Sequence, residues 1–169
     1  GKVKLFRPNR DVRFSKDKSP YKTNLAGVIT PAEGAAARYA SLDAEGLFVG
    51  AGYHDMTKDQ LERFRAGAAG TEGAALAEAV EGLREAGLDV RGRAVKTAPR
   101  GYDKDHERIE LIRMKELFTG ARLDPGKVAD AGAVRDHAAM VFAAAAPTLE
   151  WLDRHVGPSR IDPETLFAR

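Results

Sequence analysis

The fold is decided by residues 35–53, which read AAARYASLDAEGLFVGAGY. We predict that residues 35–42 and 46–53 form the two strands of a β-hairpin, because the turn at residues 43–46 offers a glycine for a positive φ. Leu47, Val49 and Ala51 would then face one side of the sheet, and Phe48 the other. The glycines at positions 50 and 52 leave a bare patch on the side of Phe48. A bulge, close helix packing, or the close approach of a backbone or ligand would each explain such a patch.

Shorter predicted elements flank this hairpin. Residues 2–6 and 24–30 are expected to be strands that precede it. Thr57 and Gln60 have capping-box spacing and predict a helix that begins there, followed by a second helix over residues 72–86 that ends at Gly87. We expect a strand over residues 90–97 and a helix over residues 107–118. A long helix should begin near Asp130, with Pro147 either kinking it or starting a further helix.

This order of elements predicts an α+β fold. Strands come first and helices afterwards, which is typical of a mostly antiparallel sheet with helices packed on one face and a C-terminal helical segment. A length of 169 residues suits a single domain over residues 1–169 with a substantial core. No internal repeat or linker divides the chain.

Composition excludes several classes of protein. Apolar residues make up 43% and charged residues 31% of the chain, as in soluble globular proteins. No apolar run reaches the roughly 18 residues of a membrane-spanning helix, so we expect no membrane partner. Cysteine is absent, which excludes disulfides and thiolate chemistry and agrees with a cytoplasmic location.

Residues 7–24, RPNRDVRFSKDKSPYKTN, concentrate the positive charge. Residues 1–24 contain eight Lys or Arg residues and two Asp residues, whereas the whole chain has a net charge of only +2. The aromatic residues Phe14 and Tyr21 lie among these charges and provide anchors. A local excess of this kind indicates a local anionic ligand rather than general adhesion to nucleic acid.

A second polar loop, PRGYDKDH at residues 99–106, adds an arginine and a tyrosine. Arginine grips phosphate or carboxylate with a planar fork of donors, and tyrosine can stack on a base. If the two loops converge, one pocket would be surrounded by the predicted ligand-binding residues Arg10, Arg13, Lys16, Lys18, Tyr21, Lys22, Arg100, Tyr102 and Lys115. We predict in particular that Arg13 lies within reach of Arg100 or Tyr102. The competing interpretation is that the arginines form ion pairs with neighbouring aspartates.

The catalytic signals are weaker. His106, Asp103 and His54 are the candidates for a general acid or base, and lone histidines are more often surface or capping residues. No two histidines have metal-ligand spacing, so we predict no metal site, and no cofactor motif is recognised. The sequence therefore does not decide whether the protein is an enzyme.

The residues RDVRFSKDKSPYKTN resemble the signature of a bacterial family known as domain of unknown function 2461. Residues 50–53 with the helix after them, and residues 98–106, are similar to later parts of the same family pattern, so that the resemblance extends from about Phe6 to about Phe118. It implies no settled activity. It does imply a helical segment before residue 1, which we expect to complete the core.

Three functions follow as hypotheses. The first is binding of a phosphorylated or otherwise anionic small molecule, possibly a nucleotide, through the two basic loops; any catalysis would be phosphoryl or phosphodiester chemistry. The second is a nucleic-acid-binding module, in which basic residues follow the backbone and aromatic residues stack on bases. The third is a protein-interaction domain without enzymatic activity.

Overall fold

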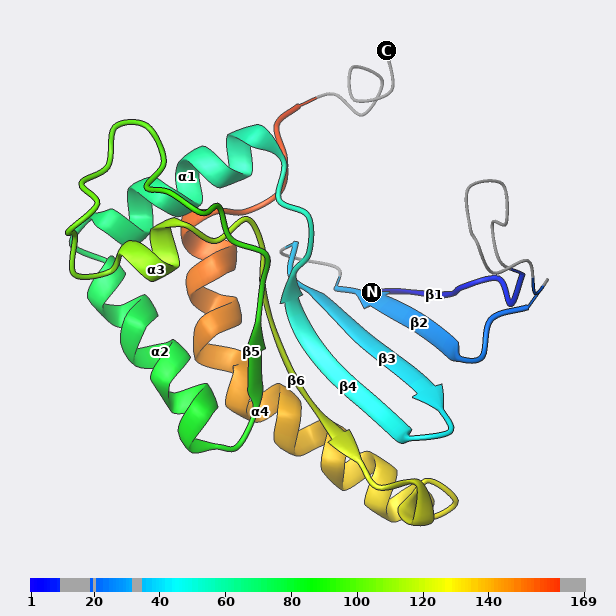
Figure 1. Ribbon diagram of the computed structural model, residues 1–169. Helices are drawn as coiled ribbons and strands as arrows, with labels where there is room; N and C mark the ends of the chain where they lie inside the picture. The colour runs from blue at the N-terminus through cyan, green and yellow to red at the C-terminus, as the bar shows by residue number, and fades with distance from the viewer. Residues whose placement is uncertain (10–18, 20, 32–34, 162–169) are drawn as a thin grey trace.

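The computed structural model describes residues 1–9, 19, 21–31 and 35–161. Its centre is a six-stranded antiparallel sheet with the strand order β1-β2-β3-β4-β6-β5. The strands are β1 (Lys2–Leu5), β2 (Leu25–Thr30), β3 (Ala37–Asp43), β4 (Gly46–Tyr53), β5 (Asp89–Arg91) and β6 (Leu117–Leu123). The predicted α+β class and the antiparallel sheet are therefore confirmed (Figure 1).

The hairpin of β3 and β4 forms as its sequence predicts. Asp43 pairs with Gly46 beside the turn, and Gly46 has a φ of +117°, which a side chain would strain. Val49 and Ala51 are buried in the core, while Phe48 lies on the opposite face. The two predicted faces of β4 are thus the two faces of the sheet.

Helices cover one of these faces. They are α1 (Lys58–Ala69), α2 (Gly73–Glu85), the short α3 (Ile109–Ile112) and α4 (Ala131–His155). In Figure 1, α4 runs along the sheet, where it contacts β4 and β6, while α2 contacts β5 and α1 lies against the other helices. The core between the helices and the sheet includes the fully buried side chains of Phe64, Leu76, Leu83 and Leu152. None of the helices in the described part of the chain is long and apolar enough to cross a membrane.

Polar contacts fix the ends of α1 and α4. Gln60 Oε1 accepts the N–H of Thr57 at 3.0 Å, which confirms the predicted capping box. Asp59 accepts hydrogen bonds from the hydroxyls of Thr57 and Ser159, and it is also paired with Arg63. These contacts tie the residues after α4 to the start of α1.

The region after α2 differs from the sequence prediction. The helix expected over residues 107–118 is wrong: only Ile109–Ile112 is helical, and Leu117 already belongs to β6. Residues 117–123, LFTGARL, form a strand because their side chains alternate between the two faces of the sheet. Leu117 and Thr119 are buried on the helix side, whereas Phe118 and Arg122 line the opposite face. The strand expected over residues 90–97 is limited to Asp89–Arg91, followed by an isolated bridge between Ala94 and Met114.

Pro147 does not start a second helix, because α4 is continuous from Ala131 to His155. The long C-terminal helix supplies the predicted C-terminal helical segment. Its N-terminus is capped by Asp130, whose side chain accepts the N–H groups of Gly132 and Ala133.

Candidate functional site

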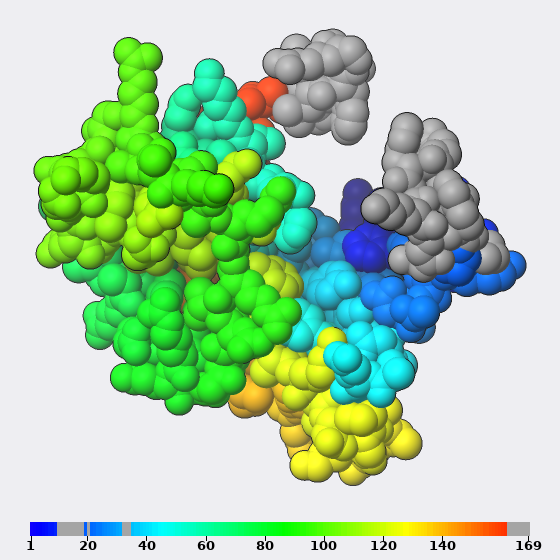
Figure 2. Space-filling model, viewed as in Figure 1, coloured from blue at the N-terminus to red at the C-terminus, as the bar shows by residue number. Residues whose placement is uncertain are grey.

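The face of the sheet opposite the helices carries a groove with a volume of about 610 Å³. Figure 2 shows the sheet exposed on this side, between the green residues around β5 and the blue residues of β1 and β2. We call this the aromatic groove. The residues that line it are Phe6, Val28, Ala37, Tyr39, Ser41, Phe48, Gly52, His54, Arg91, Gly92, Glu116, Phe118 and Arg122.

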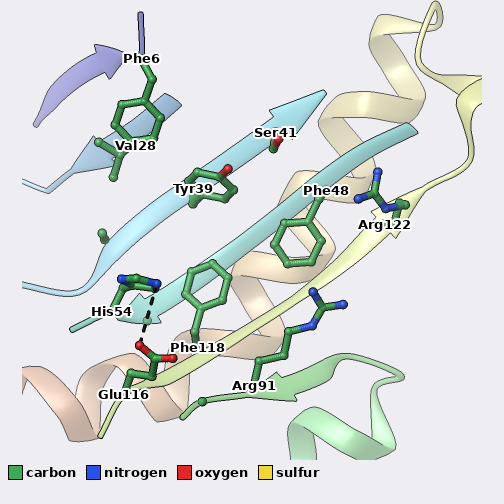
Figure 3. Close-up of a pocket in the computed structure, with 13 residues that line it drawn as sticks. Phe6, Val28, Tyr39, Ser41, Phe48, His54, Arg91, Glu116, Phe118 and Arg122 are labelled. Atoms are coloured by element: carbon green, nitrogen blue, oxygen red, sulfur yellow. Dashed lines mark ion pairs between the residues drawn. The ribbon is translucent and has the colours of Figure 1, made fainter. Parts of the chain in front are cut away.

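Four aromatic rings form a continuous row across the groove. The ring of Tyr39 on β3 lies at the centre, with centroid distances of 6.3 Å to Phe6, 6.4 Å to Phe48 and 6.2 Å to Phe118. Phe48 and Phe118, from the neighbouring strands β4 and β6, are 6.0 Å apart. Figure 3 shows these rings projecting from the same face of the sheet. Tilted and edge-on contacts at such distances hold aromatic rings in fixed orientations.

Glycines on β4 and β6 make room for these rings. Gly50 and Gly120 face each other across the two strands. A Cβ atom on Gly50 would lie 2.8 Å from the Phe118 ring, and one on Gly120 would lie 2.5 Å from the Phe48 ring. The bare patch predicted on β4 is therefore occupied by phenylalanine rings of the site itself, rather than by a bulge or a helix.

Three cations border the rings. The guanidinium of Arg91 is 5.1 Å from the centroid of the Phe48 ring, and the Nζ of Lys22 is 5.8 Å from that of Phe6. Arg122 lies beside Phe48, but its Nη1 is bound to Asp43 Oδ1 at 2.6 Å. The hydrogen bond from Arg122 lowers the pKa of Asp43, so the pair stays charged near neutral pH. Arg91 is 59% exposed, and its ion-pair partner among the described residues is the exposed Asp89, a contact of small energy.

A polar cluster closes the other end of the groove (Figure 3). His54 follows β4, and its Nε2 lies 3.8 Å from Oε2 of Glu116, while its Nδ1 lies 3.1 Å from Asp55. Glu116 is buried and accepts three hydrogen bonds from Arg93. Its Oε1 accepts from the backbone N–H of Arg93 at 3.0 Å and from Nε at 3.2 Å, and its Oε2 accepts from Nη2 of Arg93 at 3.1 Å. Arg93 also pairs with Asp55.

Electrostatics keep Glu116 ionised. Burial alone would raise the pKa of its carboxyl, but the hydrogen bonds from the side chain and the backbone of Arg93 outweigh burial and lower the pKa. Asp55 has a φ of +52°, a left-handed conformation that is uncommon outside glycine and often found at functional sites. The cluster is therefore a charged, locally strained end to an otherwise aromatic groove.

The same cluster has a geometry that metals can use. One ligand atom from each of His54, Asp55 and Glu116 lies within 4.8 Å of the others. Arg93, however, donates to Glu116 and pairs with Asp55, so a cation already occupies the space between the carboxylates. We therefore interpret the cluster as an ion-pair network and assign no metal to it.

The first basic loop reaches the groove at one residue that the structure describes. Lys22 donates its backbone N–H to Pro8 at 2.7 Å, and its side chain lies over Phe6. Tyr21, which pairs with Asn9 in an isolated bridge, is 61% exposed. The predicted residues Arg10, Arg13, Lys16 and Lys18 lie outside the described residues, so the predicted contact of Arg13 with Arg100 or Tyr102 stays a prediction.

The second loop is positioned elsewhere. Figure 1 shows residues 99–106 beside α1 and α3, far from the edge formed by β1 and β2. Arg100 is exposed and Tyr102 packs against the core, and neither lines the groove. For the described residues, the structure therefore does not bring the two loops together.

The remaining candidates have separate environments. Asp103 accepts the N–H of Asp105, and Nδ1 of His106 accepts the N–H of Arg108, so both stabilise the loop. Lys115 is exposed, and its backbone N–H is bound to Arg93. Of the three catalytic candidates, only His54 lines the groove.

Sequence reasoning missed most of the groove. The helix predicted over residues 107–118 includes Glu116 and Phe118, and Arg122 has no predicted element, although the alternation of residues 117–123 is a signal for a strand. Tyr39 and Phe48 were recognised as strand residues, but no local pattern indicates that β6 lies next to β4. Phe6 and Arg91 were at strand ends without a functional signal.

Comparison with known proteins identifies the family. The model of the family DUF2461, which is described as a conserved hypothetical protein, matches residues 1–151. The chain therefore belongs to this family. No curated protein and no solved structure matches the chain.

Proposed function

We propose that this protein binds an anionic small molecule with a flat ring, such as a nucleotide, in the aromatic groove. The observation that carries the proposal is the row of four rings bordered by Lys22 and Arg91. Rings of this kind offer stacking surface to a base, and cations beside them offer charge to a phosphate.

The size and lining of the groove support a small ligand. A volume of about 610 Å³ lies within the roughly 300–1,000 Å³ typical of small-molecule sites. Such sites are mostly apolar, with a few polar groups that fix orientation. Here the apolar part is aromatic, and the polar groups stand at its ends, with His54 and Glu116 at one end.

Charge distribution favours one orientation of this ligand. The end of the groove at His54 carries two carboxylates, Asp55 and the ionised Glu116, against the single cation Arg93, so it disfavours a phosphate. Among the residues that the structure describes, Lys22 has no ion pair and Arg91 pairs with the exposed Asp89 alone. We therefore expect the base to stack near Tyr39 and the phosphate to point toward Arg91 or Lys22.

A second candidate is single-stranded nucleic acid. The row of rings crosses strands on the open face of an antiparallel sheet, as in sheet platforms that stack successive bases. The low net charge of +2 argues against it. Salt dependence separates the two, because an oligonucleotide contacting several phosphates loses affinity log-linearly with salt, whereas a mononucleotide does so weakly.

The test is calorimetric titration with adenosine monophosphate, adenosine, ribose 5-phosphate and an oligothymidylate. We expect adenosine monophosphate to bind more tightly than either of its halves. Tyr39→Ala should weaken it by about 1–3 kcal/mol, roughly 5- to 150-fold, because stacking on the central ring is lost. Tyr39→Phe should bind nearly as wild type. Arg91→Ala, which removes a cation beside the rings, should weaken adenosine monophosphate more than adenosine, and Arg84→Ala, which removes an exposed cation of α2, is the charge control and should weaken neither.

Two results would contradict the proposal. One is that none of these compounds binds at millimolar concentration and low salt. The other is that Tyr39→Ala binds adenosine monophosphate as tightly as wild type while remaining folded.

A further inference from the structure

The sheet ends at β1, which pairs with β2 on one of its two sides. Figure 1 shows β1 at the end of the sheet away from β5 and the helices. Within the described part of the chain, no strand pairs with the outer side of β1. All four of its residues are exposed, Val3 by 70% and Leu5 by 68%. An edge strand of this kind presents backbone groups with which another chain can pair.

The register of β1 on β2 decides which backbone groups point outward. In antiparallel pairs, opposing residues that exchange two hydrogen bonds alternate with opposing residues that exchange none. The N–H of Phe6 donates to the backbone oxygen of Ala26 at 2.9 Å, so on this alternation the two lysines of β1 are bonded to β2. The N–H and C=O groups of Val3 and Leu5 therefore point away from the sheet, toward the place where a further strand would lie.

The side chains of β1 differ in character between the two faces of the sheet. Lys4 is opposite Val28, which lines the aromatic groove, so Lys2 and Lys4 project on the side of that groove. Val3 and Leu5 project on the other side, where they line a second, apolar groove. A strand added to this edge would thus meet positive charge on one face and apolar side chains on the other.

The charge on this edge determines which strand it can accept. No acidic side chain occurs among the described residues before Asp43, so the lysines of β1 have no carboxylate on the neighbouring part of β2 or β3. Lysine on an edge strand deters pairing with an edge of like charge. In a pair of two β1 strands, the four lysines would share one face of the ladder, where they repel one another. The edge therefore disfavours a second copy of this chain and favours an acidic strand.

We propose that β1 binds an extended segment of a partner protein as an additional strand, in which acidic residues alternate with apolar ones. The apolar side chains of this segment would lie beside Val3 and Leu5, and its carboxylates beside Lys2 and Lys4. Backbone hydrogen bonds supply affinity in such strand additions, and the alternating side chains supply specificity. The segment uses the edge of the sheet rather than a face, so its binding is independent of a ligand in the aromatic groove.

The probe is a fluorescein-labelled peptide of about seven residues in which glutamate and valine alternate, and a matched peptide has lysine in place of each glutamate. Fluorescence anisotropy should give saturable binding of the glutamate peptide and at least about tenfold weaker binding of the lysine peptide. Lys4→Glu should reverse this preference. Lys58→Glu, which changes an exposed lysine at the start of α1, is the matched control and should leave the preference unchanged.

Methylation of the peptide's backbone nitrogens separates strand addition from charge attraction alone. The valines of the bound peptide would lie opposite Val3 and Leu5 and donate their N–H groups to β1, so N-methylvaline at these positions should abolish binding. The N–H groups of the glutamates point away from β1, so N-methylglutamate should change the affinity by less than about threefold.

Three results would overturn the proposal. The first is equal affinity for the glutamate and lysine peptides, or no saturable binding of either at low salt. The second is an equal loss of affinity in the two methylated peptides. The third is a wild-type dimer in analytical ultracentrifugation that Val3→Pro dissociates while circular dichroism shows the variant to be folded. Val3→Pro removes an outward N–H that β2 does not use, so its effect would show that a second copy occupies this edge.

Discussion

Replacing Gly120 with alanine tests the arrangement on which the aromatic groove depends. The added Cβ would lie 2.5 Å from Cζ of Phe48, 2.4 Å from the backbone oxygen of Val49 and 2.8 Å from Cα of Gly50. Two of these three atoms are backbone of the neighbouring strand, which has no rotamer that could relieve the contact. The ring of Phe48 and part of β4 must therefore move.

The magnitude follows from two opposing terms. Overpacking of a well-packed site costs about 1–3 kcal/mol. Alanine recovers up to about 1 kcal/mol, because glycine loses more backbone freedom on folding. The expected net effect of Gly120→Ala is a destabilisation of about 1–2 kcal/mol. With a urea m-value of about 2 kcal/mol/M, the unfolding midpoint should fall by roughly 0.5–1 M.

Gly82→Ala is the matched control. Gly82 lies within α2, and a Cβ there would meet no atom within 4 Å. The same chemical change should therefore stabilise the protein by about 0.5–1 kcal/mol. Urea unfolding followed by circular dichroism measures both variants. A Gly120→Ala midpoint at or above the wild-type value, with Gly82→Ala raised as expected, would refute the packing of Phe48 over Gly120.

Three further predictions concern stability. The hydroxyl of Thr57, with the pairing of Arg63, holds the pKa of Asp59 below its unfolded value, so the stabilisation that Asp59 contributes is present above about pH 4 and is lost as the pH falls below that value. Asp59→Asn should therefore flatten the dependence of the urea midpoint on pH between about pH 5 and pH 3, and parallel curves for the variant and the wild type would contradict this. Pro147→Ala should stabilise α4 by about 1–3 kcal/mol, because Pro147 is exposed and lacks an N–H for the helix; a lower melting temperature would show that the proline is needed. Phe64→Ala should cost about 3–5 kcal/mol in urea unfolding, because the ring is fully buried, and a cost below about 1 kcal/mol would be inconsistent with that burial.

Local signals sufficed for the elements that neighbouring residues determine. The β3–β4 hairpin follows from its alternation and from Gly46, and the start of α1 follows from the spacing of Thr57 and Gln60. The C-terminal helix follows from apolar spacing after Asp130. In each case the residues that decide the structure are within a few positions of one another.

β6 and the groove depend instead on contacts between distant residues. The apolar spacing of Ile109 and Ile112 favoured a helix that continued to Phe118, and nothing local showed that Leu117 pairs with Tyr53. Without that pairing, Phe118 has no predicted neighbour on β4. His54 could be recognised as a candidate by residue type, whereas its partner Glu116 could not.

The late position of β6 in the chain has a consequence for the order of folding. β1 to β4 are neighbours in both sequence and space, so each of their pairings closes a shorter loop than the pairing of β4 with β6 does. β6 enters between β4 and β5 and joins Leu47 to Leu123 and Tyr53 to Leu117, with α1 and α2 in the intervening chain. Closing such long loops costs entropy before the contacts form, and this slows folding. We expect the pairing of β6 with β4 to be the slow step, so that the aromatic row, which needs Phe118, is completed last.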